Sequence, residues 1–143
     1  MKTSTNDGVL LLGRALICLI FLFSSFGQVT DFAQNVSHVA AAGMPFPQLA
    51  IITSIAIQSI CGLAILIGFR IRVAAWILFV FLIPTTIMLH KFWGLPSPHL
   101  QEVQFCKNMA IMGGLLFITQ LNAGAYSIDA LVGRNSSGSS FSR

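Results

Sequence analysis

Residues 73–94 read VAAWILFVFLIPTTIMLHKFWG and form the most apolar stretch of the chain, which ends in His90 and Lys91 before Trp93. An apolar run of about 20 residues is long enough for an α-helix to cross the hydrocarbon core of a bilayer. The stretch decides the fold, because it requires lipid around it and a helical backbone within it. It also raises a question: His90 and Lys91 either mark the membrane interface or belong to a site.

The composition of the whole chain also indicates a membrane protein. Hydrophobic residues make up 55% of the 143 residues and charged residues only 8%, whereas a soluble domain carries about 25% charged residues. So few charges cannot give a chain of this length a solvated surface. We therefore predict one integral membrane domain with the lipid bilayer as its main partner.

Three further apolar segments have the length of a membrane span. With the opening stretch they give four predicted spans, at about 9–26, 48–69, 73–92 and 105–121. Backbone groups in lipid must be paired within their own segment, so each span is expected to be helical. The predicted fold class is all-α, an integral membrane four-helix bundle over residues 9–130. Residues 1–8 and 131–143 are expected to form cytoplasmic tails, the second of them flexible.

The Lys and Arg residues in the short flanks predict the orientation of the spans. They lie in both tails and between the second and third spans: Lys2, Arg70, Arg72, Arg134 and Arg143. Residues 27–47 contain neither Lys nor Arg. Both termini are therefore expected in the cytoplasm, although Lys91 and Lys107 weakly oppose this orientation. The eight Lys and Arg form no basic run, so no nucleic-acid partner is indicated.

Arg14 is an ionisable residue inside the first predicted span, and such residues are costly in lipid and often functional. Its guanidinium can snorkel to the headgroups, or it can turn inward to pair with a helix C-terminus or an acidic group. Cys18, Ser25 and Gln28 fall on the same helical face as Arg14. This spacing predicts one polar stripe that faces the other helices.

The second and third spans also carry polar residues at helical spacing. Ser54, Gln58 and Gly62 follow one another at four-residue intervals, and Thr86 precedes His90 by one turn. Such small and polar faces allow helices to approach closely and to form hydrogen bonds between them.

The predicted topology places several polar side chains at similar membrane depths. The candidate binding pocket consists of Gln58, His90, Lys107 and Asn108. The alternative is an ordinary wet interface in which Gln58 and its neighbours serve only helix packing.

The sequence contains no complete catalytic constellation, so enzymatic activity is left open. His38, His90, His99, Glu102 and Cys106 show no metal-ligand spacing, and we predict no metal site. Cys18, Cys61 and Cys106 form no CxxC pair. No cofactor is evident from these residues, and quinone is a candidate only through the family resemblance given below.

Short sequence pieces in a fixed order resemble the DoxX family of small bacterial inner-membrane proteins over about residues 11–130. The pieces are Leu12-Gly13-Arg14, Ala42-Gly43-Met44-Pro45, Gly62-Leu63-Ala64, Gly68-Phe69-Arg70, His90-Lys91-Phe92-Trp93, Phe105-Cys106-Lys107-Asn108-Met109-Ala110 with Gly113-Gly114, and Tyr126-Ser127-Ile128-Asp129. The resemblance implies a four-helix protein of the bacterial plasma membrane.

The resemblance also implies a redox setting. Members of the family include subunits of a thiosulfate:quinone oxidoreductase and of a mycobacterial membrane complex linked to thiol and superoxide defence. The family usually has Glu where this chain has Gln58, which removes a proton-accepting group and weakens a proton-coupled mechanism here.

Three functions compete at this point. The first is an accessory or anchor subunit of a membrane redox or stress-response system near the quinone pool, with a membrane or soluble oxidoreductase as partner. The second is a carrier or binding protein for a small lipophilic solute, working as a homo-oligomer. The third is a purely structural membrane protein.

Overall fold

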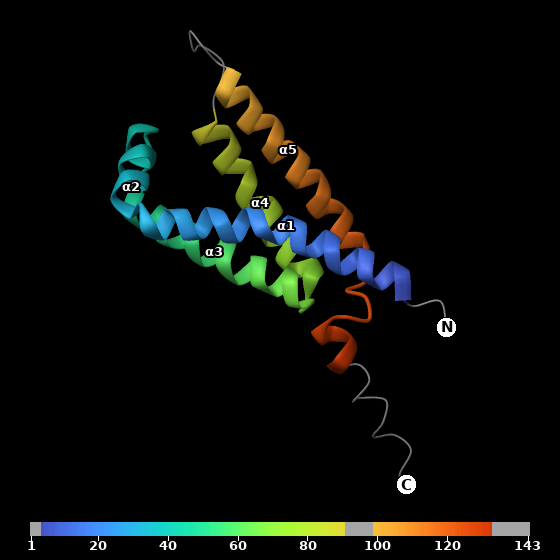
Figure 1. The fold of residues 1–143 in the computed structure, drawn as a ribbon. Coiled ribbons are helices and arrows are strands. Elements are labelled where there is room, and N and C mark those ends of the chain that lie inside the picture. The colour runs from blue at the N-terminus through green and yellow to red at the C-terminus, as the bar shows by residue number, and fades with distance from the viewer. Residues whose placement is uncertain (1–3, 91–98, 133–143) are drawn as a thin grey trace.

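The structure, a computed structural model, describes residues 4–90 and 99–132, and these residues form helices and no strand (Figure 1). In chain order the helices are α1 (Ser4–Thr30), α2 (Phe32–Ala41), α3 (Pro47–Ile67), α4 (Ile71–Leu89) and α5 (His99–Gln120). A short helical turn at 128–132 follows. The prediction of an all-α membrane fold is confirmed.

Four of the helices are long enough to cross a membrane. α1, α3, α4 and α5 contain 27, 21, 19 and 22 residues, and a rise of about 1.5 Å per residue makes each about 28 Å or longer. Within the described residues, α1 from Asn6, α3 and α4 are also apolar enough to span. The first turns of α5 are polar, so the span at 105–121 stays a prediction.

The connection from α1 to α3 contains a helix that lies outside the four predicted spans. α1 continues to Thr30, and α2 follows after one residue. Phe32, Val36 and Val39 recur at helical spacing and form its apolar face, with Val39 buried. α2 is therefore a short amphipathic helix that packs against the start of α3.

The reversal from α3 to α4 takes three residues. Gly68 ends α3 in the left-handed conformation with φ 76°, and Arg70 precedes α4 with φ 43°. A left-handed residue just after a helix lets the chain turn sharply while backbone N–H groups pair with the last carbonyls. The Phe69 N–H donates to the Ala64 carbonyl at 2.8 Å. This tight turn makes α3 and α4 antiparallel neighbours.

The helices form two packed pairs. α1 packs on α3, α4 packs on α5, and the contact between α3 and α4 joins the pairs, which cross at an angle in Figure 1. We call the end that carries α2 and the start of α5 the α2 end. We call the opposite end, with the start of α1 and residues 68–70 and 121–132, the turn end.

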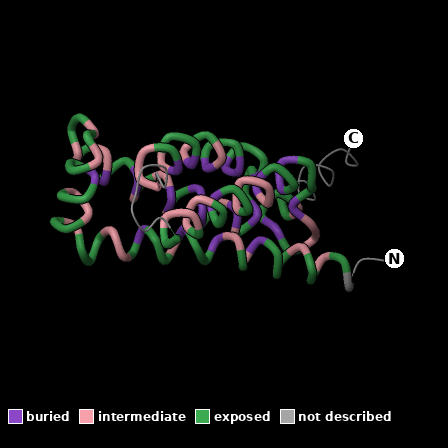
Figure 2. The backbone as a smooth tube through the Cα atoms, turned by 90° about the horizontal axis from the view of Figure 1, so that it is seen from above, coloured by how far each residue is buried: buried purple, intermediate pink, exposed green. Residues whose placement is uncertain are grey.

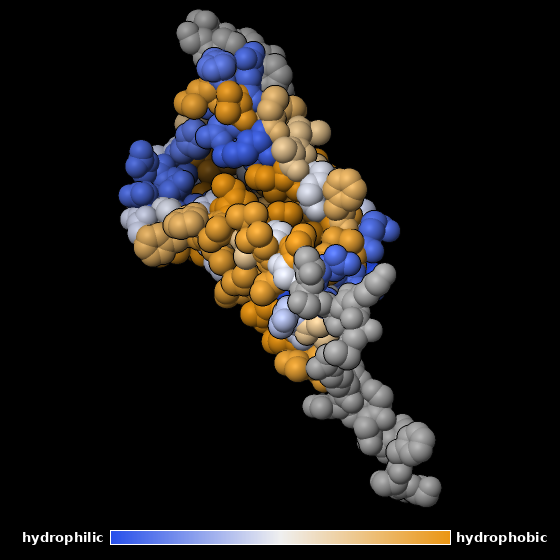
Figure 3. All heavy atoms as spheres, turned by 45° about the vertical axis from the view of Figure 1, so that its right-hand side comes forward, coloured by the Kyte–Doolittle hydropathy of each residue, from blue (hydrophilic) through white to orange (hydrophobic). Residues whose placement is uncertain are grey.

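Buried residues lie on the facing sides of the helices (Figure 2). The predicted polar stripe of α1 faces inward, with Arg14, Cys18 and Ser25 buried and Gln28 half-buried. The face shown in Figure 3 is mostly apolar along its middle, with hydrophilic residues near α2 and the start of α5. This distribution is that of a protein surrounded by lipid along its length.

Arg14 joins three parts of the turn end. Its side chain is only 4% exposed, and its Nη2 donates a hydrogen bond to the Tyr126 carbonyl. Its Nη1 lies against Gly68, at the C-terminus of α3. The negative end of a helix dipole favours a cation at this place. The guanidinium thus turns inward, toward the C-terminus of α3 and the Tyr126 carbonyl.

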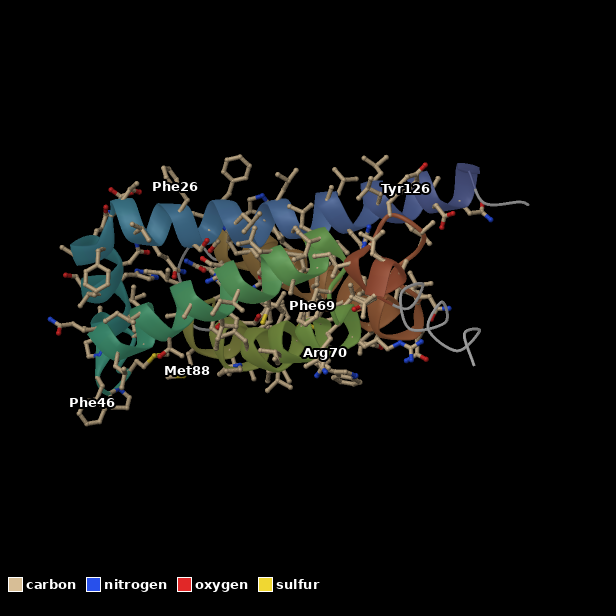
Figure 4. All side chains as sticks on the ribbon, turned by 90° about the horizontal axis from the view of Figure 1, so that it is seen from below. Phe26, Phe46, Phe69, Arg70, Met88 and Tyr126 are labelled. Carbon is tan, nitrogen blue, oxygen red and sulfur yellow. The ribbon has the colours of Figure 1, made fainter. Side chains whose placement is uncertain are left out.

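Two carboxylates hold the same C-terminal segment on the bundle. Asp7 Oδ1 accepts the Ala125 N–H at 3.0 Å, and Asp129 Oδ2 accepts the Arg70 N–H at 2.9 Å. These bonds tie residues 121–132 to α1 and to the turn before α4. Figure 4 shows Tyr126, Phe69 and Arg70 toward this end, and Phe46 and Met88 toward the α2 end.

We expect Gly68→Ala to lower the free energy of unfolding by about 2–4 kcal/mol, because the added methyl group meets both strain and a collision. A Cβ at position 68 would collide with Arg14 Nη1 and lie 2.9 Å from Ser127 Cα. Sodium dodecyl sulfate titration followed by circular dichroism measures the change.

Gly43→Ala is the matched control. Gly43 has the same left-handed backbone, with φ +82°, but nothing lies within 4 Å of an added Cβ. This variant should lose only about 1–2 kcal/mol. Equal losses for the two variants would contradict close packing of Arg14 on Gly68.

Candidate functional site

An apolar pocket opens at the α2 end between α2, α3 and α4. Its volume is about 520 Å³, which is in the range of small-molecule sites. Met44, Leu49, Ala50, Phe81 and Met88 contribute to its apolar wall. The kink-prone Pro84 also lines it, and Thr85 Oγ1 donates to the Phe81 carbonyl at 2.9 Å. The pocket can therefore accept a hydrocarbon chain or ring.

A second cavity, the polar hollow, lies between the end of α1 and α2. It measures about 690 Å³, and Ser24, Asp31, Gln34 and Ser37 are among its lining residues. Unlike the apolar pocket, its wall consists mainly of polar side chains.

Three polar residues line both the apolar pocket and the polar hollow. They are Gln28 of α1 and Asn35 and His38 of α2. Together they form a polar boundary between the two cavities. A molecule with an apolar body and a polar head would place its head at this boundary and its body in the apolar pocket.

Gln28 is the boundary residue with an unmet hydrogen-bonding need. Its Oε1 is buried and has no partner among the described residues. Asn35 Nδ2, in contrast, donates to the Asp31 carbonyl at 2.9 Å. A buried acceptor without a donor costs free energy, so Gln28 favours a ligand that brings a donor.

None of the four residues of the candidate pocket proposed from the sequence lines the apolar pocket or the polar hollow. Gln58 Nε2 donates to Ser54 Oγ at 2.7 Å within α3. Lys107 is exposed and contacts Gln104 on its own helix. Neither residue lines the apolar pocket or the polar hollow.

His90 and Asn108 contribute instead to a polar seam between α4 and α5. Asn108 Nδ2 donates to Thr86 Oγ1 at 3.0 Å, and both side chains are buried. One turn further, His90 Nδ1 lies 3.0 Å from Gln101 Oε1. These bonds join the two helices, as expected for polar groups in a membrane interior.

Two of the three boundary residues, Asn35 and His38, lie on α2 and were not predicted as binding residues. The sequence pattern suggested His38 only as a metal ligand and assigned Asn35 no binding role. The signal that could have found them is the spacing of Phe32, Val36 and Val39. An amphipathic helix placed on the bundle by that face turns its polar residues toward the end of α1.

The chemistry that the chain can perform depends on Arg14 and on the described His, Cys, Asp and Glu residues. No group of three or more of these four residue types is close enough to hold a metal in the part of the chain that the structure describes. Arg14 Nε and Nη1 have no hydrogen-bond acceptor there either. The arrangement can bind and orient a lipophilic molecule, and no described cluster supplies a nucleophile with its base.

Long apolar helices, buried polar seams and an apolar pocket near one end define a multi-pass helical membrane protein with a lipophile-sized site. The family model of DoxX matches residues 9–91. The chain belongs to the DoxX family, as its sequence pieces indicated.

Two curated relatives from Escherichia coli (strain K12) match nearly the whole chain. Inner membrane protein YqjF is 31% identical over 134 residues, covering 94% of this chain and 98% of the relative. Inner membrane protein YphA is 28% identical over 123 residues, covering 85% of this chain and 88% of the relative. No solved structure matches the chain significantly.

The Thr86–Asn108 hydrogen bond can be measured with a double-mutant cycle. We expect Thr86→Val and Asn108→Leu to show a coupling energy of about 0.6–1.7 kcal/mol in unfolding titrations, because a buried interhelical bond is lost in each single variant. The exposed pair Gln104 and Lys107 is the control and should couple by less than about 0.5 kcal/mol. Equal coupling in both pairs would show that the α4–α5 seam adds no stability.

Proposed function

We propose that the protein is a membrane-embedded binding subunit that holds a lipophilic molecule in the apolar pocket and serves a redox system near the quinone pool. The observation that supports this most is the pocket of about 520 Å³ with polar residues along one side. A quinone or quinol has this shape, a flat polar ring with an apolar tail. The redox part of the proposal also rests on the chain's resemblance to the DoxX family, whose members include oxidoreductase subunits.

An accessory role fits the chemistry of the described residues better than an isolated enzyme. A binding subunit needs a cavity and a few oriented polar groups, and the chain has these at Gln28, Asn35 and His38. Electron transfer would then belong to an oxidoreductase partner in the membrane or at its surface. A carrier for another lipophilic solute would use the same pocket and is the second candidate.

The proposed location is the bacterial inner membrane, because both curated relatives are named inner membrane proteins. The proposed orientation places the turn end in the cytoplasm. Arg70 and Arg72 lie at that end, whereas residues 27–47 at the α2 end contain neither Lys nor Arg. The apolar pocket would then open in the outer half of the bilayer.

Ala50→Trp should block the apolar pocket, because Ala50 is half-buried and lines it. We expect native mass spectrometry of the purified protein, incubated with a short-chain quinone and its quinol, to detect the bound molecule on the unmodified chain. Occupancy should fall about tenfold or more in the variant, since a well-filled pocket contributes at least about 1.4 kcal/mol. Extractable quinone and co-purifying proteins are measured on the same samples.

Ala56→Trp is the matched control, with the same substitution on an exposed position of α3 that lies outside the pocket. Its occupancy should equal that of the unmodified chain. Equal occupancy in all three proteins would show that quinone does not use this pocket. Absence of quinone, quinol and other extractable lipophiles from the unmodified chain would favour a structural role.

The orientation can be read from reporter fusions to the C-terminus. We expect a fused green fluorescent protein to fluoresce and a fused alkaline phosphatase to stay inactive, because the turn end carries the Arg residues that are retained in the cytoplasm. Fusions after Ala42, at the end of α2, should give the opposite pattern. An active phosphatase at the C-terminus would reverse the proposed orientation.

A further inference from the structure

We infer that the site at the α2 end selects a lipophile with an uncharged or cationic head that donates a hydrogen bond, and that it rejects carboxylate and phosphate heads. This inference rests on the proposed function and names the ligand class of that same site. It follows from three observations: the two cavities share lining residues, their walls carry no Lys or Arg, and the buried Oε1 of Gln28 has no donor among the described residues.

The shared lining residues set the depth at which the head lies. Gln28, Asn35 and His38 separate an apolar wall from a polar one. A hydrocarbon tail gains free energy only in the apolar pocket, whereas a polar head loses free energy if it enters that pocket without partners. The head therefore stays at the boundary, with the polar hollow on its other side.

The charge of the walls argues against an anionic head. No Lys or Arg lines the apolar pocket or the polar hollow, and Asp31 contributes a carboxylate to the hollow. An anion at the boundary would give up water with no Lys or Arg to pair with, since His38 is the one basic side chain that lines both cavities, and it would lie near the Asp31 carboxylate. A hydroxyl, amine or ammonium head meets neither penalty.

Gln28 identifies what the head must supply. Its buried Oε1 has no donor among the described residues. Two neighbouring side chains are already engaged, since Asn35 Nδ2 donates to the Asp31 carbonyl and Thr85 Oγ1 to the Phe81 carbonyl. A head with an O–H or N–H group would satisfy Gln28. Between the two forms of a quinone, this favours the reduced quinol, whose hydroxyl groups donate.

The experiment compares three photoreactive lipophiles that share one diazirine-bearing chain and differ only in the head: an alcohol, an ammonium and a carboxylate. The full chain is placed in nanodiscs of zwitterionic lipid, irradiated with each probe and digested for mass spectrometry. We expect the alcohol and the ammonium to label peptides from residues 44–54 and 81–89. The carboxylate should label them about tenfold less, since it is desolvated near Asp31 with no counter-ion.

Variants separate the two parts of the inference. Asp31→Asn should raise carboxylate labelling of the pocket, and Gln28→Leu should lower alcohol labelling about fivefold, which is the usual effect of one lost buried hydrogen bond. Gln48→Leu is the control, because Gln48 is exposed and lines neither cavity. Equal alcohol labelling in Gln28→Leu and Gln48→Leu would overturn the role of Gln28.

The comparison of heads on the unmodified chain needs no variant and distinguishes the two proposals. Equal labelling of the pocket by all three heads, or preference for the carboxylate, would overturn the head selectivity while the proposed binding function stands. Labelling of other segments with none in the pocket by any probe would overturn the binding function itself.

Discussion

A guanidinium in the interior of a membrane protein requires oxygen acceptors, and Arg14 finds its acceptor on the Tyr126 carbonyl. The geometry of the turn end follows from this requirement. Gly68 must lack a side chain to admit the guanidinium, and its left-handed backbone also ends α3. Asp7 and Asp129 then fix the backbone of the same C-terminal segment. One buried cation thus sets the packing of α1, the α3–α4 turn and residues 121–132.

The two ends of the molecule differ in charge. At the turn end, Arg14 donates to the Tyr126 carbonyl and Arg72 to Asn122 Oδ1, and a hollow of about 590 Å³ lies between residues 70–73 and 121–130. At the α2 end the helices enclose cavities, and the polar side chains there are mostly neutral. Hydrogen bonds at the turn end join residues 121–132 to α1 and to the turn before α4, whereas the apolar pocket lies at the α2 end. A binding site at the α2 end is consistent with this division.

The long apolar runs predicted α1, α3 and α4, because a segment that crosses lipid needs about 20 apolar residues and a helical backbone. The candidate site was harder to predict, because it depends on rotation about helix axes. Lys107 and Asn108 are neighbours in sequence, yet one is exposed and the other is buried against Thr86. The lining residues Asn35 and His38 lie on α2, whose ten residues are too short for a span. Spacing alone therefore predicted the inward stripe of Arg14, Cys18 and Ser25. Which polar residues line the cavities depends on tertiary packing.

The separation of Arg14 from its acceptor has a consequence for biogenesis. The two groups lie 112 residues apart in the chain, so α1 leaves the ribosome and enters the bilayer long before Tyr126 is made. During that interval the guanidinium must stay at the headgroups or be held by the insertion machinery. Burial of Arg14 therefore belongs to the last stage of assembly, when the C-terminal segment docks. A chain that ended before Tyr126 would lack the acceptor of Arg14 and could not complete this end of the bundle.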